Sequence, residues 1–155
     1  MVKVRQVGAG GYWRVFNEKS DSSVVRQSHS LACVAAAGEM LLQERGEQVS
    51  QTEIARIIGA PSNAERLAKY LNGLGLSASG WIGGCFDVQY LDAILATGTW
   101  GTVLREGSPL GHMVLVEGVD DKGRIRIKDP FDQTAYQMAR SDFIRHLSEF
   151  VCDKR

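Results

Sequence analysis

The segment from 112 to 129 constrains the fold more than any other part of the chain. Two strongly apolar or alternating runs, HMVLVEGV at 112–119 and RIRIKD at 124–129, flank the residues Asp-Asp-Lys-Gly at 120–123. A turn that ends in glycine between two such runs is typical of a β-hairpin. The second half of the chain is therefore predicted to form an antiparallel sheet.

The charges along these two runs predict the register of the hairpin. One pairing sets Glu117 opposite Arg126 and Val116 opposite Ile127. The alternative sets Glu117 opposite Ile127, so that a charged and an apolar side chain share one face of the sheet. A shift of one residue moves every side chain of a strand to the other face, which makes this register unfavourable. The first pairing is therefore favoured.

In the favoured register a carboxylate lies close to an imidazole. Asp129, at the end of the second run, falls on the same face as His112, at the start of the first. Such a carboxylate can hold the tautomer of an imidazole and orient it toward a nucleophile. The alternative is that His112 is a polar residue at the edge of a strand, with no chemical role.

The first half of the chain carries helix signals. An alanine-rich apolar stretch at 32–45 has the length and propensity of a buried helix, and Gly46 is placed to stop it. Ser50-x-x-Glu53 is a capping box that opens a second helix. The other expected elements are a flexible glycine-rich start at 8–11, a short strand at 12–16, helices at 50–59, 62–73 and 87–97, a strand at 101–105 and a last helix at 141–148 that closes the chain.

These elements predict an α+β fold, with helices first and an antiparallel sheet second. A length of 155 residues is about the size of one domain, so a single domain over 1–155 is expected.

Cys33 lies at the start of the alanine-rich helix. The N–H groups and the dipole at a helix N-terminus favour an anion, and a thiolate is the reactive form of cysteine. Gln27 precedes Cys33 by six residues, so its amide, together with the backbone N–H of Cys33, is a candidate pair of donors to an oxyanion. The alternatives are a cysteine buried as a small apolar residue and an ordinary loop glutamine.

These motifs resemble those of the papain-like cysteine peptidases. The pattern is Gln-x5-Cys opening a helix, then Gly-His followed by an apolar strand, then Asp-Pro. More narrowly, residues 24–148 resemble the bacteriocin-processing peptidases that cleave after double-glycine leaders. The resemblance implies a papain-like fold, with Cys33 as nucleophile and His112 as base. It also implies that Asp129 orients His112 and that Gln27 supplies the oxyanion-hole side chain.

The resemblance also implies a narrow cleft that admits Gly-Gly before the scissile bond. Trp81, Phe86, Trp100 and Met113 are candidates for its walls. One residue departs from the pattern: the family usually has glycine after the nucleophile, and this chain has Val34. A bulkier residue there is expected to narrow the site, so the substrate is less firmly implied than the catalytic residues.

Composition argues against several other functions. Lys plus Arg and Asp plus Glu each number 18, and this balance gives no reason to expect nucleic acid or an anionic membrane as a partner. No apolar run reaches 18 residues, so no membrane span is expected, and the N-terminus does not read as a Sec signal. The three cysteines, without a CxxC pair, suggest neither a disulfide framework nor a zinc site, although one bridge between Cys85 and Cys152 stays open. No metal, nucleotide or other cofactor is expected.

Three biological roles are compatible with the resemblance. The first is an interbacterial toxin effector, neutralised by a cognate immunity protein and delivered into the cytoplasm of a target cell without a Sec signal. The second is a cytoplasmic peptidase that matures bacteriocin precursors, although such enzymes are usually fused to a membrane exporter. The third is a glutamine deamidase with the same thiol chemistry, or a non-catalytic binding module.

Overall fold

The computed structural model describes residues 2–7, 11–77, 79–106 and 110–153, so positions 8–10 of the expected glycine-rich start lie outside the described residues. Its elements, in chain order, are β1 (Val2–Val7), β2 (Gly11–Ser20), α1 (Cys33–Gln43), α2 (Gln51–Ile58), α3 (Ala64–Gly73), β3 (Trp81–Cys85), a 3-10 turn (Val88–Tyr90), α4 (Leu91–Leu95), β4 (Trp100–Leu104), β5 (His112–Val119), β6 (Ile125–Asp129), β7 (Thr134–Met138), α5 (Arg140–His146) and β8 (Leu147–Asp153).

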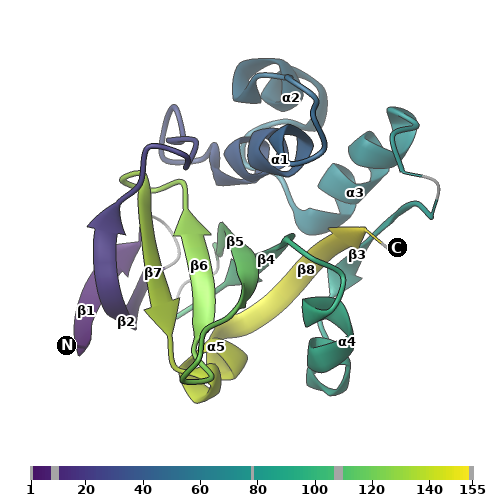
Figure 1. Cartoon of the computed structure of the whole chain (residues 1–155). Helices are drawn as coiled ribbons and strands as arrows, with labels where there is room; N and C mark the ends of the chain where they lie inside the picture. Colours follow the sequence, from purple (N-terminus) through teal and green to yellow (C-terminus); the bar gives the residue numbers. More distant parts are fainter. Residues whose placement is uncertain (1, 8–10, 78, 107–109, 154–155) are drawn as a thin grey trace.

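The strands form one sheet in the order β1-β2-β7-β6-β5-β4-β8-β3, and each neighbouring pair is antiparallel. Helices α1, α2 and α3 gather on one side of this sheet (Figure 1). The predicted α+β class is confirmed. The predicted strand at 12–16 lies within β2, and the sheet is larger than predicted because β1, β3, β7 and β8 add strands to it.

The central strand β5 separates two apolar clusters. Met113 and Leu115 point toward the cluster formed with α1, α2 and α3, whereas Val114 and Val116 point into a second cluster on the other face. All four side chains are fully buried. A strand that is buried on both faces is expected to read as a continuous apolar run, and this is how residues 113–116 appear in the sequence.

The helix signals are largely confirmed, with one change of cap. Ser50 accepts a hydrogen bond from the backbone N–H of Glu53 at 3.2 Å, as the capping box predicts. The third helix is capped by Asn63, which accepts from the N–H of Arg66 at 2.8 Å. Ser62, the predicted cap, instead donates its hydroxyl to the carbonyl of Ile58 at 3.1 Å.

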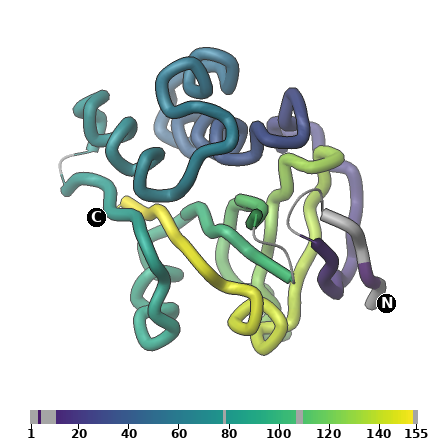
Figure 2. Tube along the Cα trace, turned by 180° about the vertical axis from the view of Figure 1, so that it is seen from behind, coloured from purple at the N-terminus to yellow at the C-terminus, as the bar shows by residue number. Residues whose placement is uncertain are grey.

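The prediction that a helix closes the chain is wrong. Helix α5 ends at His146, and the chain continues as β8, which lies between β4 and β3 in the sheet. Figure 2 shows this C-terminal strand, in yellow, running beside its neighbours. Val151 packs into one apolar cluster and Cys152 into the other. Neighbouring residues that serve opposite faces fit a strand and do not fit one face of a helix.

The predicted hairpin of β5 and β6 is confirmed, with a bulge that the pattern did not indicate. Near the turn, Gly118 and not Glu117 faces Arg126, so the predicted register is wrong there. Beyond the irregularity at Glu117, Val116 faces Ile127, as predicted. Gly118 has a φ of 139°, a conformation that glycine adopts without strain. The bulge restores the predicted register toward His112 and Asp129.

No helix among the described residues is long and apolar enough to cross a membrane.

Candidate active site

Cys33 is the first residue of α1 and lies at the junction between that helix and the sheet. It is buried, and its Sγ accepts a hydrogen bond from the backbone N–H of Met113 at 3.4 Å. Ala32, at the N-cap, offers no side-chain hydrogen bond, and the first turn of α1 contains no acidic residue. The positive end of the helix dipole is therefore not neutralised by a side chain and acts on the thiol.

His112 and Asp129 meet across the hairpin, as predicted. Their Nε2 and Oδ1 atoms are 2.6 Å apart, and both side chains are buried. Gly111 allows the chain to pass closely here, because a Cβ at this position would overlap the Val103 side chain and lie 3.1 Å from Cγ of Arg105. The glycine of the Gly-His pair thus has a packing reason.

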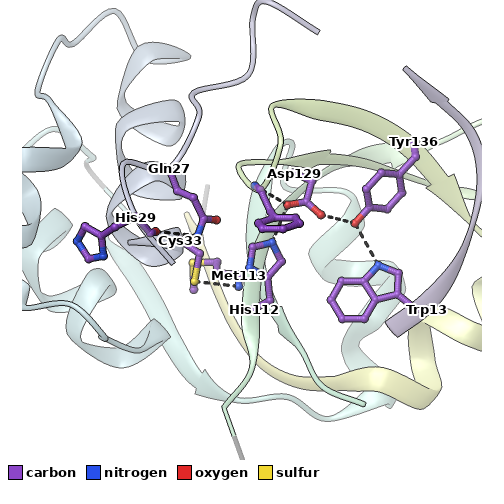
Figure 3. A network of polar contacts seen from close by, with 9 residues as sticks. Trp13, Gln27, His29, Cys33, His112, Met113, Asp129 and Tyr136 are labelled. Atoms are coloured by element: carbon purple, nitrogen blue, oxygen red, sulfur yellow. Dashed lines mark hydrogen bonds and ion pairs between the residues drawn. The ribbon is translucent and has the colours of Figure 1, made fainter. Parts of the chain in front are cut away.

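Two residues that the sequence did not single out extend this pair inward. Tyr136 donates its hydroxyl to Oδ2 of Asp129 at 2.6 Å, and the indole N–H of Trp13 donates to the Tyr136 oxygen at 3.1 Å (Figure 3). Trp13 also stacks on His112, with ring centroids 6.2 Å apart. No local signal could have found this network, because Trp13 and Tyr136 are 123 positions apart.

Gln27 lies on the loop before α1, and its amide is held in one orientation. Its Nε2 donates to the carbonyl of His29 at 2.9 Å, and this carbonyl also accepts from the N–H of Ala32. A carbonyl acceptor requires the NH₂ side of the amide, so the orientation is fixed. The amide therefore keeps a second N–H next to the segment that leads into Cys33.

A cleft of about 250 Å³ opens beside Cys33. Its apolar lining includes Leu31, Val34, Val103, Leu110 and Met113. Of the four wall candidates, only Met113 is found there. Two of the others have different places, because Trp100 is buried in the second apolar cluster and Trp81 packs under the guanidinium of Arg45.

Comparisons with known proteins show a likeness to a protease by sequence and to peptidase domains by fold. No family model matches the chain. Over 142 residues the chain is 40% identical to Cysteine protease effector 1 of Escherichia coli O1:K1:H7, an alignment that covers 90% of this chain and 28% of that protein. The chain is therefore similar to a segment of a protein named a cysteine protease effector. It spans little more than a quarter of this relative.

Solved structures of peptidase domains share the fold. The peptidase domain of Streptococcus ComA, a bi-functional ABC transporter, has a TM-score of 0.67 at 16% identity, over 84% of this chain and 97% of that one. A double-glycine-motif protease from an AMS/PCAT transporter, in complex with its leader peptide, has a TM-score of 0.65 at 18% identity, over 98% and 96%. At such low identity these likenesses concern the fold alone.

The electrostatics at Cys33 and His112 favour a thiolate–imidazolium pair. Burial raises the pKa of the Cys33 thiol, but the hydrogen bond and charge of His112, with the Met113 amide, outweigh it and leave the pKa lowered. Burial lowers the pKa of His112, but the Asp129 carboxylate and Cys33 raise it to about 10. Each charge of the pair thus stabilises the other.

We expect Cys33 to react with iodoacetamide well below the pH at which an ordinary thiol, of pKa about 8.5, becomes reactive. In His112→Ala the imidazolium is absent while burial remains, so the apparent pKa of Cys33 should rise. The imidazolium of His112 should be lost above about pH 10, and an activity that depends on it should decline there. Mass spectrometry of the Cys33 peptide measures alkylation, and the exposed Cys85 in the same sample serves as reference. An unchanged alkylation profile in His112→Ala would contradict the ion pair.

The remaining histidines and cysteines lie apart from Cys33, His112 and Asp129. His29 is exposed, and His146 is buried in α5 with Nδ1 2.8 Å from the Glu106 carboxylate. Cys85 and Cys152 both keep their thiols, so the bridge between them is not formed. In the part of the chain that the structure describes, no group of three or more His, Cys, Asp or Glu side chains is arranged to hold a metal ion.

Proposed function

We propose that this chain is a cysteine endopeptidase that cleaves protein substrates after Gly-Gly and acts as an interbacterial effector. One observation carries the proposal: Cys33, at the start of α1, interacts with His112, which in turn contacts Asp129, and Cys33 lines a cleft. The likeness to a protein named a cysteine protease effector supports it. In this proposal Cys33 is the nucleophile, His112 the acid and base, and Asp129 the orienting acid.

The first half of the reaction is acylation. The Cys33 thiolate attacks the scissile carbonyl carbon, and its oxygen becomes an oxyanion that accepts from the Gln27 amide and the backbone N–H of Cys33. The imidazolium of His112 then gives its proton to the departing nitrogen. The C–N bond breaks, the amine product leaves, and a thioester to Cys33 remains.

Deacylation reverses the roles of the same residues. Neutral His112 takes a proton from a water molecule, and the hydroxide attacks the thioester carbonyl. The S–C bond breaks, the carboxylic acid product leaves, and the thiolate–imidazolium pair is restored. Asp129 keeps His112 oriented throughout, because its carboxylate accepts from Nε2 at 2.6 Å.

The lining of the cleft supports a preference for glycine. Leu31, Val34 and Met113 bring branched or long apolar side chains next to Cys33. Val34 is itself packed tightly, with 4% of its surface exposed, so it has little room to move aside. In this proposal the two substrate glycines lie against these walls, where an added methyl group would have to displace them.

We expect the enzyme to cut peptides after Gly-Gly and to cut poorly when either glycine becomes alanine. A peptide library with the two positions varied, mapped by mass spectrometry, measures this preference. Cys33→Ala enzyme is the matched control for contaminating peptidases. Efficient cleavage after bulky residues would reject the glycine slot. Products that show only a gain of one dalton at glutamine would indicate deamidation instead.

Maturation of bacteriocin precursors is the second candidate. The observation that favours it is the fold likeness, over 98% of the chain, to a double-glycine-motif protease in complex with a leader peptide. The two roles differ in what the enzyme needs from its substrate. An effector cuts Gly-Gly in a folded protein without a leader, is delivered into the cytoplasm of a target cell and requires a cognate immunity protein in the producing cell. A maturation enzyme loses its activity when the leader is removed from the precursor.

A further inference from the structure

We propose that Tyr136, with its hydroxyl proton directed by Trp13, is a positioning residue that keeps Asp129 a pure hydrogen-bond acceptor and so sets the tautomer of His112. The proposal rests on the proposed function, in which Cys33, His112 and Asp129 perform the chemistry. The four residues come from four successive strands of the sheet, Trp13 on β2, Tyr136 on β7, Asp129 on β6 and His112 on β5.

The direction of each hydrogen bond follows from the chemistry of its donor. An indole N–H can only donate, so the Trp13 contact at 3.1 Å makes the Tyr136 oxygen an acceptor. The hydroxyl then has one proton left, and the carboxylate oxygen Oδ2 of Asp129 lies 2.6 Å away. Tyr136 therefore donates to Asp129 and does not accept from it.

The other oxygen of Asp129 also faces donors. Its Oδ1 accepts from the backbone N–H of Phe131 at 2.8 Å, a group that can only donate. Hydrogen bonds to the charged form of a buried carboxylate favour that form, so Asp129 is held as an anion. At the 2.6 Å contact the proton must then belong to Nε2 of His112. This leaves Nδ1 as the nitrogen that exchanges a proton with Cys33.

The network of Trp13, Tyr136 and Asp129 is buried. Trp13, Tyr136 and Asp129 are each at most 2% exposed, so water does not compete for their hydrogen bonds. Titratable groups also face the network from other elements. Cys33 approaches His112 from α1, and His146 of α5 lies beside Trp13, with ring centroids 6.0 Å apart and its own partner in Glu106.

The substitution Tyr136→Phe removes the donor and keeps the ring. Loss of a hydrogen bond to the charged carboxylate raises the pKa of Asp129 and weakens its hold on the imidazolium, so the thiolate is less favoured. We expect the apparent pKa of Cys33 in iodoacetamide alkylation to rise by about one unit, and kcat to fall about tenfold with little change in KM. Trp13→Phe should raise the apparent pKa of Cys33 and lower kcat by smaller amounts. The Tyr136 hydroxyl remains in this variant, but the indole N–H that orients it is absent.

Two controls separate positioning from mere packing. Tyr70→Phe, at a half-buried tyrosine of α3, removes a hydroxyl outside the network and should leave the alkylation profile unchanged. In an Asp129→Asn background, Tyr136→Phe should add no further shift, because a residue that acts through Asp129 has nothing left to act on. Circular dichroism checks that each variant is folded. If Tyr136→Phe does not fold, the alkylation profile of Trp13→Phe tests the proposal in its place.

A wild-type alkylation profile in folded Tyr136→Phe, or equal shifts with and without Asp129, would overturn the proposal. Alkylation needs no peptide substrate. If the alkylation shifts of Tyr136→Phe and Trp13→Phe are as expected but the protein cuts no Gly-Gly peptide, the result contradicts the proposed function and leaves the role of Tyr136 intact.

Discussion

Cys33→Ala is expected to reduce cleavage of Gly-Gly peptides to background, a loss of about 10⁴-fold or more, because it removes the nucleophile on which covalent catalysis depends. The fold should persist. Cys33 is a small buried side chain at a helix start, and alanine has a higher helix propensity, so the free energy of unfolding should change by about 1 kcal/mol or less. Peptide cleavage followed by mass spectrometry and thermal melts followed by circular dichroism measure the two effects.

The matched control for this substitution is Cys85→Ala, which removes an exposed thiol at the end of β3. It should leave cleavage unchanged. The same pair of variants, expressed in a bacterial cytosol, tests the effector role, because only enzymes with Cys33 should slow growth and produce cleaved host proteins. Residual turnover by Cys33→Ala, or loss of its fold, would contradict the assignment of the nucleophile.

Gln27→Ala is expected to lower kcat by about 10²–10³-fold, the usual loss when one oxyanion donor is removed, with a smaller change in KM. The reason is that the amide contributes most in the transition state, when the carbonyl oxygen carries a negative charge. Steady-state kinetics on a Gly-Gly peptide separates the two constants, and the thiolate of the variant should still react with iodoacetamide.

Gln133→Ala provides a matched control for Gln27. The Nε2 of Gln133 also donates to a backbone carbonyl, that of Val24 at 2.8 Å, but it comes from the β6–β7 turn and is not part of the proposed oxyanion hole. Its loss should affect stability more than kcat. A Gln27→Ala enzyme with normal kcat would leave Gln27 as a loop residue that only ties its amide to His29.

The parts of the fold that could be predicted from the sequence are those governed by local patterns. The capping box at Ser50, the apolar stretch after Cys33 and the hairpin around 120–123 each depend on residues within a few positions of one another. The contact of His112 with Asp129 could be predicted for the same reason. Only 17 positions separate them, and a hairpin register fixes which side chains share a face.

Elements that owe their form to distant partners were missed. The strand β8 follows a short helix and has no turn signal before it, and its conformation depends on β4 and β3, which pair with its two edges. The bulge at Glu117 is similar. The charge pattern favoured one register along the whole hairpin, whereas the carboxylate of Glu117 reaches Arg126 at 3.9 Å and Lys128 at 3.5 Å from the irregular position.

The sequence by itself predicted thiol chemistry: helix and strand signals place a cysteine at a helix start and a histidine–carboxylate pair on one hairpin, and the motifs resemble those of papain-like peptidases. Only the tertiary structure decided how that chemistry is held and what it can reach. The hydrogen bond from Trp13 to Tyr136 and the cleft between α1 and the ends of β4, β5 and β8 join residues that are far apart in the chain. The order of the strands and the packing of the helices bring these residues together, and no periodic pattern in the sequence indicates either of them.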